Sequence, residues 1–149
     1  MSCTIRPAVR GDEFVLIDLI KGLAKYEKEP LEAVENTPEK LGADLFDSKL
    51  CEAIIAEKDG EVIGFSIYYT SYSTWKGPCM YLEDLYVIPE ARGTGAGGKL
   101  FDRIVEIARE RNYARMDWQV LDWNTPAIEF YKKRGATIDE EWFNGRLFF

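Results

Sequence analysis

The spacing of apolar residues along the chain predicts alternating helices and strands. Apolar positions at helical spacing predict helices over residues 12–26 and 100–111, and residues typical of helix ends predict helices over 38–46 and 124–134. Apolar runs or apolar–polar alternation predict strands over residues 5–7, 52–58, 61–70, 80–87 and 115–121. Two short segments near the C-terminus, 136–139 and 146–149, are expected to pair as closing strands.

Residues that favour helix ends and turns mark the limits of these elements. Asp12 is suited to cap the first helix, and Thr37-Pro38 is a typical start of the second. Asp59-Gly60 predicts a tight hairpin turn, and Gly135 suits a left-handed C-terminal cap. The polar segment 71–78 is expected to be a loop.

The order of these elements predicts one mixed α/β domain over residues 1–149. Its sheet is expected to be antiparallel in the first half, with helices on both faces. Hydrophobic residues make up 46% of the 149-residue chain and aromatic residues 13%. The chain is therefore long and apolar enough to bury a substantial core.

Charge, cysteine and histidine content narrow the range of functions. A net charge of −7 argues against a nucleic-acid partner and suits a cationic substrate. No segment resembles a membrane span or a signal peptide, and three cysteines lack the spacing of a metal site. We therefore expect a cytoplasmic protein with no membrane partner and no metal. Because the chain has no histidine, catalytic triads and metal sites that use histidine are excluded.

A glycine-rich run from Arg92 to Lys99 gives the strongest functional signal. It lies between a predicted strand and a predicted helix. Glycines at a helix start let backbone N–H groups converge on an anion, and the helix dipole adds to the attraction. A turn without a ligand is the alternative, but glycines in a first helical turn cost about 1 kcal/mol each. We therefore expect a phosphate-bearing ligand here.

Three phosphate-loop patterns overlap in this run. Gly93, Gly95 and Gly98 satisfy the G-x-G-x-x-G of dinucleotide sites, although that fold requires further βα units after the loop. A Walker loop requires a serine or threonine where the chain has Leu100. The third pattern, Arg-x-x-Gly-x-Gly from Arg92 onward, is complete.

The third pattern resembles the pyrophosphate loop of the GNAT N-acetyltransferases, which bind the diphosphate of acetyl-CoA. Further segments resemble one branch of that superfamily, the diamine (spermidine/spermine) and thialysine acetyltransferases. They appear in the same order as in that branch and span nearly the whole chain: Leu23–Glu27, Tyr81–Asp84, Arg92–Gly97, Trp123–Pro126 and Phe130–Ala136. Residues 137–149 match the branch poorly.

The resemblance implies direct acetyl transfer from acetyl-CoA to a primary amine of a small cationic substrate. Polyamines, diamines and lysine-like amines such as thialysine are the candidates. It assigns Tyr131 as the general acid, since a phenol with an ordinary pKa of about 10 can protonate a departing thiolate. From spacing alone, Tyr131 is a core aromatic beside Phe130. Two other functions stay open, acetylation of a protein or peptide amino group and a catalytically silent CoA-binding module.

Glu83 and Asp84 are adjacent carboxylates in an otherwise apolar predicted strand. A buried carboxylate needs a partner, and a salt-bridged surface pair is the simplest alternative. The resemblance places Glu83 at the substrate amine, as a base acting through water. The amine is expected in an acidic groove whose residues are Tyr26, Glu27, Glu83, Asp84, Asp117 and Trp118.

The resemblance also implies the contacts of acetyl-CoA. The peptide groups of Leu85, Tyr86 and Val87 are expected to bind its pantetheine arm, beside a bulge that lets an N–H near Leu85 polarise the acetyl carbonyl. The pyrophosphate loop and the start of the fourth helix supply the other contacts: Arg92, Gly93, Thr94, Gly95, Ala96, Gly97, Gly98, Asn124, Pro126 and Ala127.

Apolar residues crowd the C-terminal segment. They are Trp142, Phe143, Leu147, Phe148 and Phe149. An exposed patch of this kind often marks an interface, and twofold pairing is the commonest solution. The resemblance likewise implies a homodimer. The alternative is that these residues close the chain's own core as a final strand.

Overall fold

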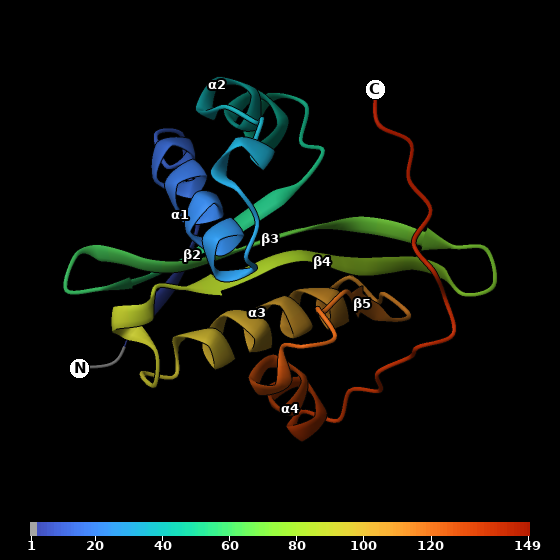
Figure 1. The fold of residues 1–149 in the computed structure, drawn as a ribbon. Helices are drawn as coiled ribbons and strands as arrows, with labels where there is room; N and C mark the ends of the chain where they lie inside the picture. The colour runs from blue at the N-terminus through green and yellow to red at the C-terminus, as the bar shows by residue number, and fades with distance from the viewer. Residues whose placement is uncertain (1–2) are drawn as a thin grey trace. The chain divides into compact units, whose positions relative to one another are not determined.

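The computed structural model describes residues 3–149 and contains the predicted alternation of helices and strands (Figure 1). The strands are β1 (Thr4–Pro7), β2 (Glu52–Lys58), β3 (Glu61–Ser73), β4 (Gly77–Val87) and β5 (Met116–Trp118). The α-helices are α1 (Glu13–Tyr26), α2 (Pro38–Gly42), α3 (Ala96–Glu110) and α4 (Thr125–Lys133). Short helical turns of other types cover Leu31–Ala33, Ala43–Asp47 and Pro89–Ala91.

The described residues form two compact units, one ending at Trp118 and one covering Gln119–Phe149. The first contains a five-stranded sheet in the order β1-β2-β3-β4-β5. Neighbouring strands from β1 to β4 are antiparallel, and β5 runs parallel to β4. In this unit α1 and α2 lie on one face of the sheet and α3 on the other (Figure 1). The predicted mixed sheet with an antiparallel first half is confirmed.

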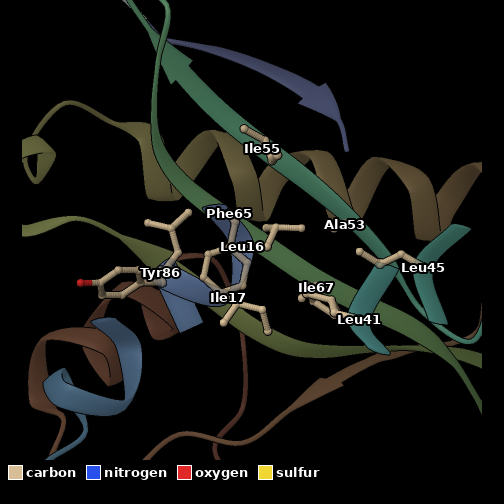
Figure 2. Close-up of a cluster of buried hydrophobic side chains, with 10 residues drawn as sticks. Leu16, Ile17, Leu41, Leu45, Ala53, Ile55, Phe65, Ile67 and Tyr86 are labelled. Carbon is tan, nitrogen blue, oxygen red and sulfur yellow. The ribbon is translucent and has the colours of Figure 1, made fainter. Parts of the chain in front are cut away.

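The core between α1 and the sheet is built from alternate strand residues. Figure 2 shows Leu16 and Ile17 of α1 among side chains that include Phe65 and Tyr86. Helical spacing predicts a buried stripe in α1 made of Leu16, Ile17, Ile20, Leu23 and Ala24. The burial of Leu16 and Ile17 is confirmed, the other three are half-buried, and Leu19, outside the stripe, is also buried. On the opposite face of the sheet, helical spacing places five apolar residues on one side of α3, and the structure buries all of them: Leu100, Phe101, Ile104, Ile107 and Ala108.

Several predicted turns and caps are confirmed. Asp59 and Gly60 both have positive φ values, 52° and 78°, and join β2 to β3 as a tight hairpin. The hydroxyl of Thr37 accepts a hydrogen bond from the Lys40 N–H (3.2 Å) and caps α2. Gly135 follows α4 with a φ of 87°, the left-handed geometry expected after a helix.

The predicted side-chain cap at Asp12 is wrong. Asp12 precedes α1, but its side chain makes no cap hydrogen bond. Its carboxylate instead accepts hydrogen bonds from both terminal nitrogens of Arg6 (2.8 and 3.1 Å) and from the Val9 N–H (2.7 Å). A cationic partner is a stronger donor than a neutral helix amide, so the tertiary contact replaces the local one.

The predicted loop at 71–78 is also wrong, because β3 and β4 extend into it. Ser71 pairs with Cys79 and Ser73 with Gly77, which leaves only residues 74–76 as the turn. The hydrogen bonds of the ladder do not require apolar side chains, so a polar composition did not reveal these strands.

The second unit contains α4 and a C-terminal segment without regular structure after residue 135. The predicted closing strands at 136–139 and 146–149 are therefore not formed. The five apolar residues from Trp142 to Phe149 are at least 82% exposed. A strand pair needs a hydrophobic face packed against other elements, and these residues have none.

Candidate acetyl-CoA and amine site

The strand β4 contains a bulge at Glu83. Ile67 of β3 pairs with Asp84, while the next residue, Tyr68, pairs with Leu82, so Glu83 is the extra residue. The bulge expected from the family resemblance is thus present. Beside it, the buried Ser66 hydroxyl donates a hydrogen bond to the Asp84 carbonyl (2.8 Å).

Beyond the bulge, one edge of β4 has no strand beside it in residues 3–118. The ladder with β5 covers only Met80–Leu82. Because the Ile88 N–H donates to Ile63 on β3 (2.9 Å), strand alternation turns the peptide groups of Leu85 and Val87 toward the open edge. These are backbone donors and acceptors that an extended ligand can pair with.

The glycine-rich run has the geometry of an anion site. Gly93 and Gly95 have φ values of 82° and 84°, and Gly95 is the residue from which α3 starts. A Cβ atom at either position would meet no atom within 4 Å. The first N–H groups of an α-helix have no acceptor within the helix. The run therefore offers both free space and unsatisfied donors, and it fits a diphosphate.

Arg92 links the glycine-rich run to the rest of the site. Its Nε donates to the Val87 carbonyl (3.2 Å), and its guanidinium lies over the ring of Tyr26, 4.7 Å from the ring centre. Tyr86 packs in the core, where a Cβ at Gly22 of α1 would lie 2.9 Å from its hydroxyl. Glycine at position 22 therefore makes room for Tyr86.

Three predicted acids come together near the bulge. The pKa of Asp84 is raised to about 7, first by burial and then by the negative charges of Glu83 and Glu27. Burial also raises the pKa of Glu27, with added effects of Glu29 and Glu83. Carboxylates that oppose one another's ionisation produce a strongly negative local potential, which a cation relieves.

Two tyrosines that sequence reasoning missed lie beside these acids. Tyr69 and Tyr81 face each other across β3 and β4, with ring centres 5.1 Å apart. Burial and then the charge of Glu83 raise the pKa of both phenols. Aromatic faces attract cations. Only the pairing of β3 with β4 brings the two rings together, and the register of that pairing cannot be read from the sequence.

Two other predicted substrate residues have partners within the protein, and their substrate role stays a prediction. Both carboxylate oxygens of Asp117 accept hydrogen bonds from Arg115 Nε, at 2.8 and 2.9 Å. Trp118 packs edge-to-face on Phe101 of α3, with ring centres 5.4 Å apart. The structure thus brings Glu27, Glu83 and Asp84 together, whereas Trp118 contacts the helix on the other face of the sheet.

In the second unit, α4 holds the remaining predicted residues. The Asn124 side chain accepts a hydrogen bond from the Ala127 N–H (3.4 Å), and proline at 126 occupies the first turn. Tyr131 is buried, and its ring lies edge-to-face against Phe130 at 5.3 Å. The catalytic and cofactor roles of this helix stay predictions.

Within residues 3–149, no group of three or more His, Cys, Asp or Glu side chains is arranged to hold a metal ion. None of the described helices is both long enough and apolar enough to cross a membrane.

Comparisons with known proteins identify similar acetyltransferases. A model of the Acetyltransferase (GNAT) family matches residues 20–136. Thialysine N-epsilon-acetyltransferase of Bos taurus is 41% identical over 141 residues, covering 89% of this chain and 82% of that protein. Spermidine/spermine N(1)-acetyltransferase-like protein 1 of Homo sapiens is 36% identical over 93% of this chain and 21% of its own length.

The fold comparison agrees with the sequence comparisons. A crystal structure described as a possible acetyltransferase from Clostridium difficile superposes with a TM-score of 0.81 and 20% identity, covering both chains completely. At that identity the similarity shows the fold, which is the same mixed sheet. The family match and the 41% identity to a thialysine acetyltransferase show that this chain belongs to the Acetyltransferase (GNAT) family and is an acetyl-CoA-dependent N-acetyltransferase.

Proposed function

We propose that this enzyme transfers the acetyl group of acetyl-CoA to a primary amine of a small cationic substrate, such as a polyamine, a diamine or a lysine-like amine. The observation that carries the proposal is the cluster of Glu27, Glu83 and Asp84 at the open edge of β4. The two similar acetyltransferases, whose names refer to thialysine and to spermidine/spermine, support the same substrate class.

Each proposed residue has one task in the transfer. Glu83 accepts a proton from the substrate ammonium through water, which leaves a neutral amine nitrogen to attack the acetyl carbonyl carbon. The Leu85 N–H stabilises the negative charge that forms on the carbonyl oxygen, a type of interaction commonly worth about 3 kcal/mol. Tyr131 gives its proton to the sulfur as the C–S bond breaks. The acylated nitrogen then loses its second proton through water to the Tyr131 phenolate, which leaves a neutral amide and free CoA. Asp84 and Glu27 hold the positive charge of the substrate.

A spectrophotometric assay of CoA thiol release tests the proposed function. We expect turnover with spermidine, diaminopropane or thialysine, and little turnover with a lysine-containing peptide. Glu83→Gln should lower kcat/KM for the amine while acetyl-CoA affinity stays unchanged; Glu90→Gln, an exposed acid outside the cluster, is the matched control. Preferred use of the peptide would favour a protein acetyltransferase. No turnover with any amine would favour a silent CoA-binding protein.

The pKa of Asp84 predicts a pH dependence of cation binding. With a pKa of about 7, Asp84 is about one-tenth ionised at pH 6 and about nine-tenths at pH 8. A quaternary-ammonium competitor keeps its charge at every pH, so its affinity should rise up to about tenfold over this range. The inhibition constant measures this rise, and Asp84→Asn should abolish it. A pH dependence that persists in Asp84→Asn would assign the titration to another group.

We further propose that the protein is cytoplasmic. We also propose that it forms a homodimer through its exposed C-terminal segment. That segment supports the dimer because it carries five apolar residues at high exposure. Light scattering after size exclusion should give twice the chain mass of 17.1 kDa at micromolar concentration. A mass near that of one chain would contradict the dimer.

A further inference from the structure

A cavity lies at the opposite end of α3 from the glycine-rich run. It has a volume of about 500 Å³, within the range of small-molecule sites. It lies where β1 ends and β2 begins, beside the C-terminal half of α3. Its apolar lining includes Leu45, Ile54 and Ile107. None of the residues assigned to acetyl transfer lines it.

Tyr68 of β3 places a polar atom in this apolar lining. The residue is only 4% exposed, and its hydroxyl makes no hydrogen bond within residues 3–149. No fully enclosed side-chain nitrogen or oxygen of the described chain lacks a partner. The Tyr68 hydroxyl is therefore not enclosed, and it reaches the cavity that the residue lines. A buried polar group in this situation calls for a partner from outside the fold.

The hydroxyl of Tyr68 is a proton donor throughout the physiological range. Its pKa is raised to about 12, first by burial and then by the charge of Glu52. Arg111 and Arg103 act in the opposite direction. The phenol thus stays protonated and lies close enough to two guanidinium groups to feel their charge. An acceptor with a negative charge suits both kinds of donor.

The charge of the lining also favours an anion. Three arginines and two glutamates line the cavity: Arg6, Arg103, Arg111, Glu52 and Glu110. The lining therefore carries one excess positive charge, in a chain whose net charge is −7. A positive patch on an acidic protein attracts anions selectively.

The three arginines differ in how many of their N–H donors are bound by acidic side chains of the protein. Arg6 binds two acids, and Arg111 forms a bidentate pair with Glu52 at 2.8 and 2.7 Å. Arg103 uses only Nη1, at 3.3 Å from Glu106 and 3.2 Å from Glu110. Its Nη2 and Nε donors make no hydrogen bond within the described residues. Arg103 can therefore bind a ligand through its remaining N–H donors without breaking a short ion pair.

We propose that this cavity binds a small organic carboxylate with an apolar body, whose carboxylate is held by Arg103 and the Tyr68 hydroxyl. The apolar lining takes the body of the ligand. The amine site takes cations, so the two sites select ligands of opposite charge. This binding does not depend on the proposed amine substrate.

Titration of the whole chain with phenylacetate, followed by protein-detected NMR, tests the proposal. We expect saturable shifts at residues of the cavity lining, including Ile54 and Ile107. Tyr68→Phe and Arg103→Gln should each weaken binding about tenfold or more, the loss of one charge-assisted hydrogen bond. Arg109→Gln, an exposed arginine on the same helix, is the control and should leave binding unchanged.

Neutral phenylacetamide separates charge recognition from simple apolar packing. We expect it to bind at least about tenfold more weakly than phenylacetate. Any one of three results would overturn the proposal. These are equal binding of the acid and the amide, no saturable shifts at the cavity lining, and unchanged affinity for phenylacetate in both variants. Acetyl-CoA affinity, measured in both variants, shows that they are folded. Because the readout is binding at the cavity, a negative result here is distinct from failure of the proposed amine acetylation.

Discussion

Tyr131→Phe is expected to lower kcat about 10²- to 10⁴-fold while acetyl-CoA binding stays unchanged, because removal of a general acid typically costs that much. The thiolate then has to leave without a proton from the protein. The ring of Tyr131 packs edge-to-face on Phe130, and phenylalanine preserves that contact. Loss of one buried hydroxyl should cost only about 1 kcal/mol of stability.

The measurement is single-turnover acetyl transfer, in which product release does not limit the rate. Calorimetric titration with acetyl-CoA checks the binding of the same variant. Tyr72→Phe, at a tyrosine that is 73% exposed on β3, is the matched control and should keep full activity. If Tyr131→Phe retains the wild-type rate under these conditions, Tyr131 is a packing residue.

Gly95→Asp should weaken acetyl-CoA binding by about a hundredfold or more, the second large effect we expect. The substitution places a carboxylate in the open space beside the first turn of α3, where the diphosphate is expected. It adds repulsion between two negative charges and removes the attraction of the helix start. The φ of 84° at this position also disfavours any side chain.

Two controls separate charge from backbone strain. Gly95→Ala adds only the strain, so its loss of affinity should be much smaller. Gly60→Asp makes the same change at another positive-φ glycine, in the β2–β3 turn, and should leave binding unchanged. Calorimetry that finds undiminished acetyl-CoA binding in Gly95→Asp would exclude the loop as the diphosphate site.

The candidate site was partly visible in the sequence. The glycine-rich run could be recognised because its function depends on backbone N–H groups and glycine spacing, which are local properties. The closeness of Glu27 to Glu83 and Asp84 was expected only from family resemblance, because α1 and β4 are far apart in the chain. The raised pKa of Asp84 could not be predicted, since it depends on burial and on neighbours from two elements.

The sequence by itself determined the order of the elements from β1 to α4. The Asp59-Gly60 turn, the Thr37 cap and the buried stripe of α3 depend on residues within a few positions of one another. The tertiary structure decided what depends on distant partners. It pairs the Asp12 carboxylate with Arg6 rather than with the first N–H groups of α1, because a guanidinium is the stronger donor. It also set the register that makes Glu83 the extra residue of a bulge, because pairing with β3 fixes which residue of β4 has no partner.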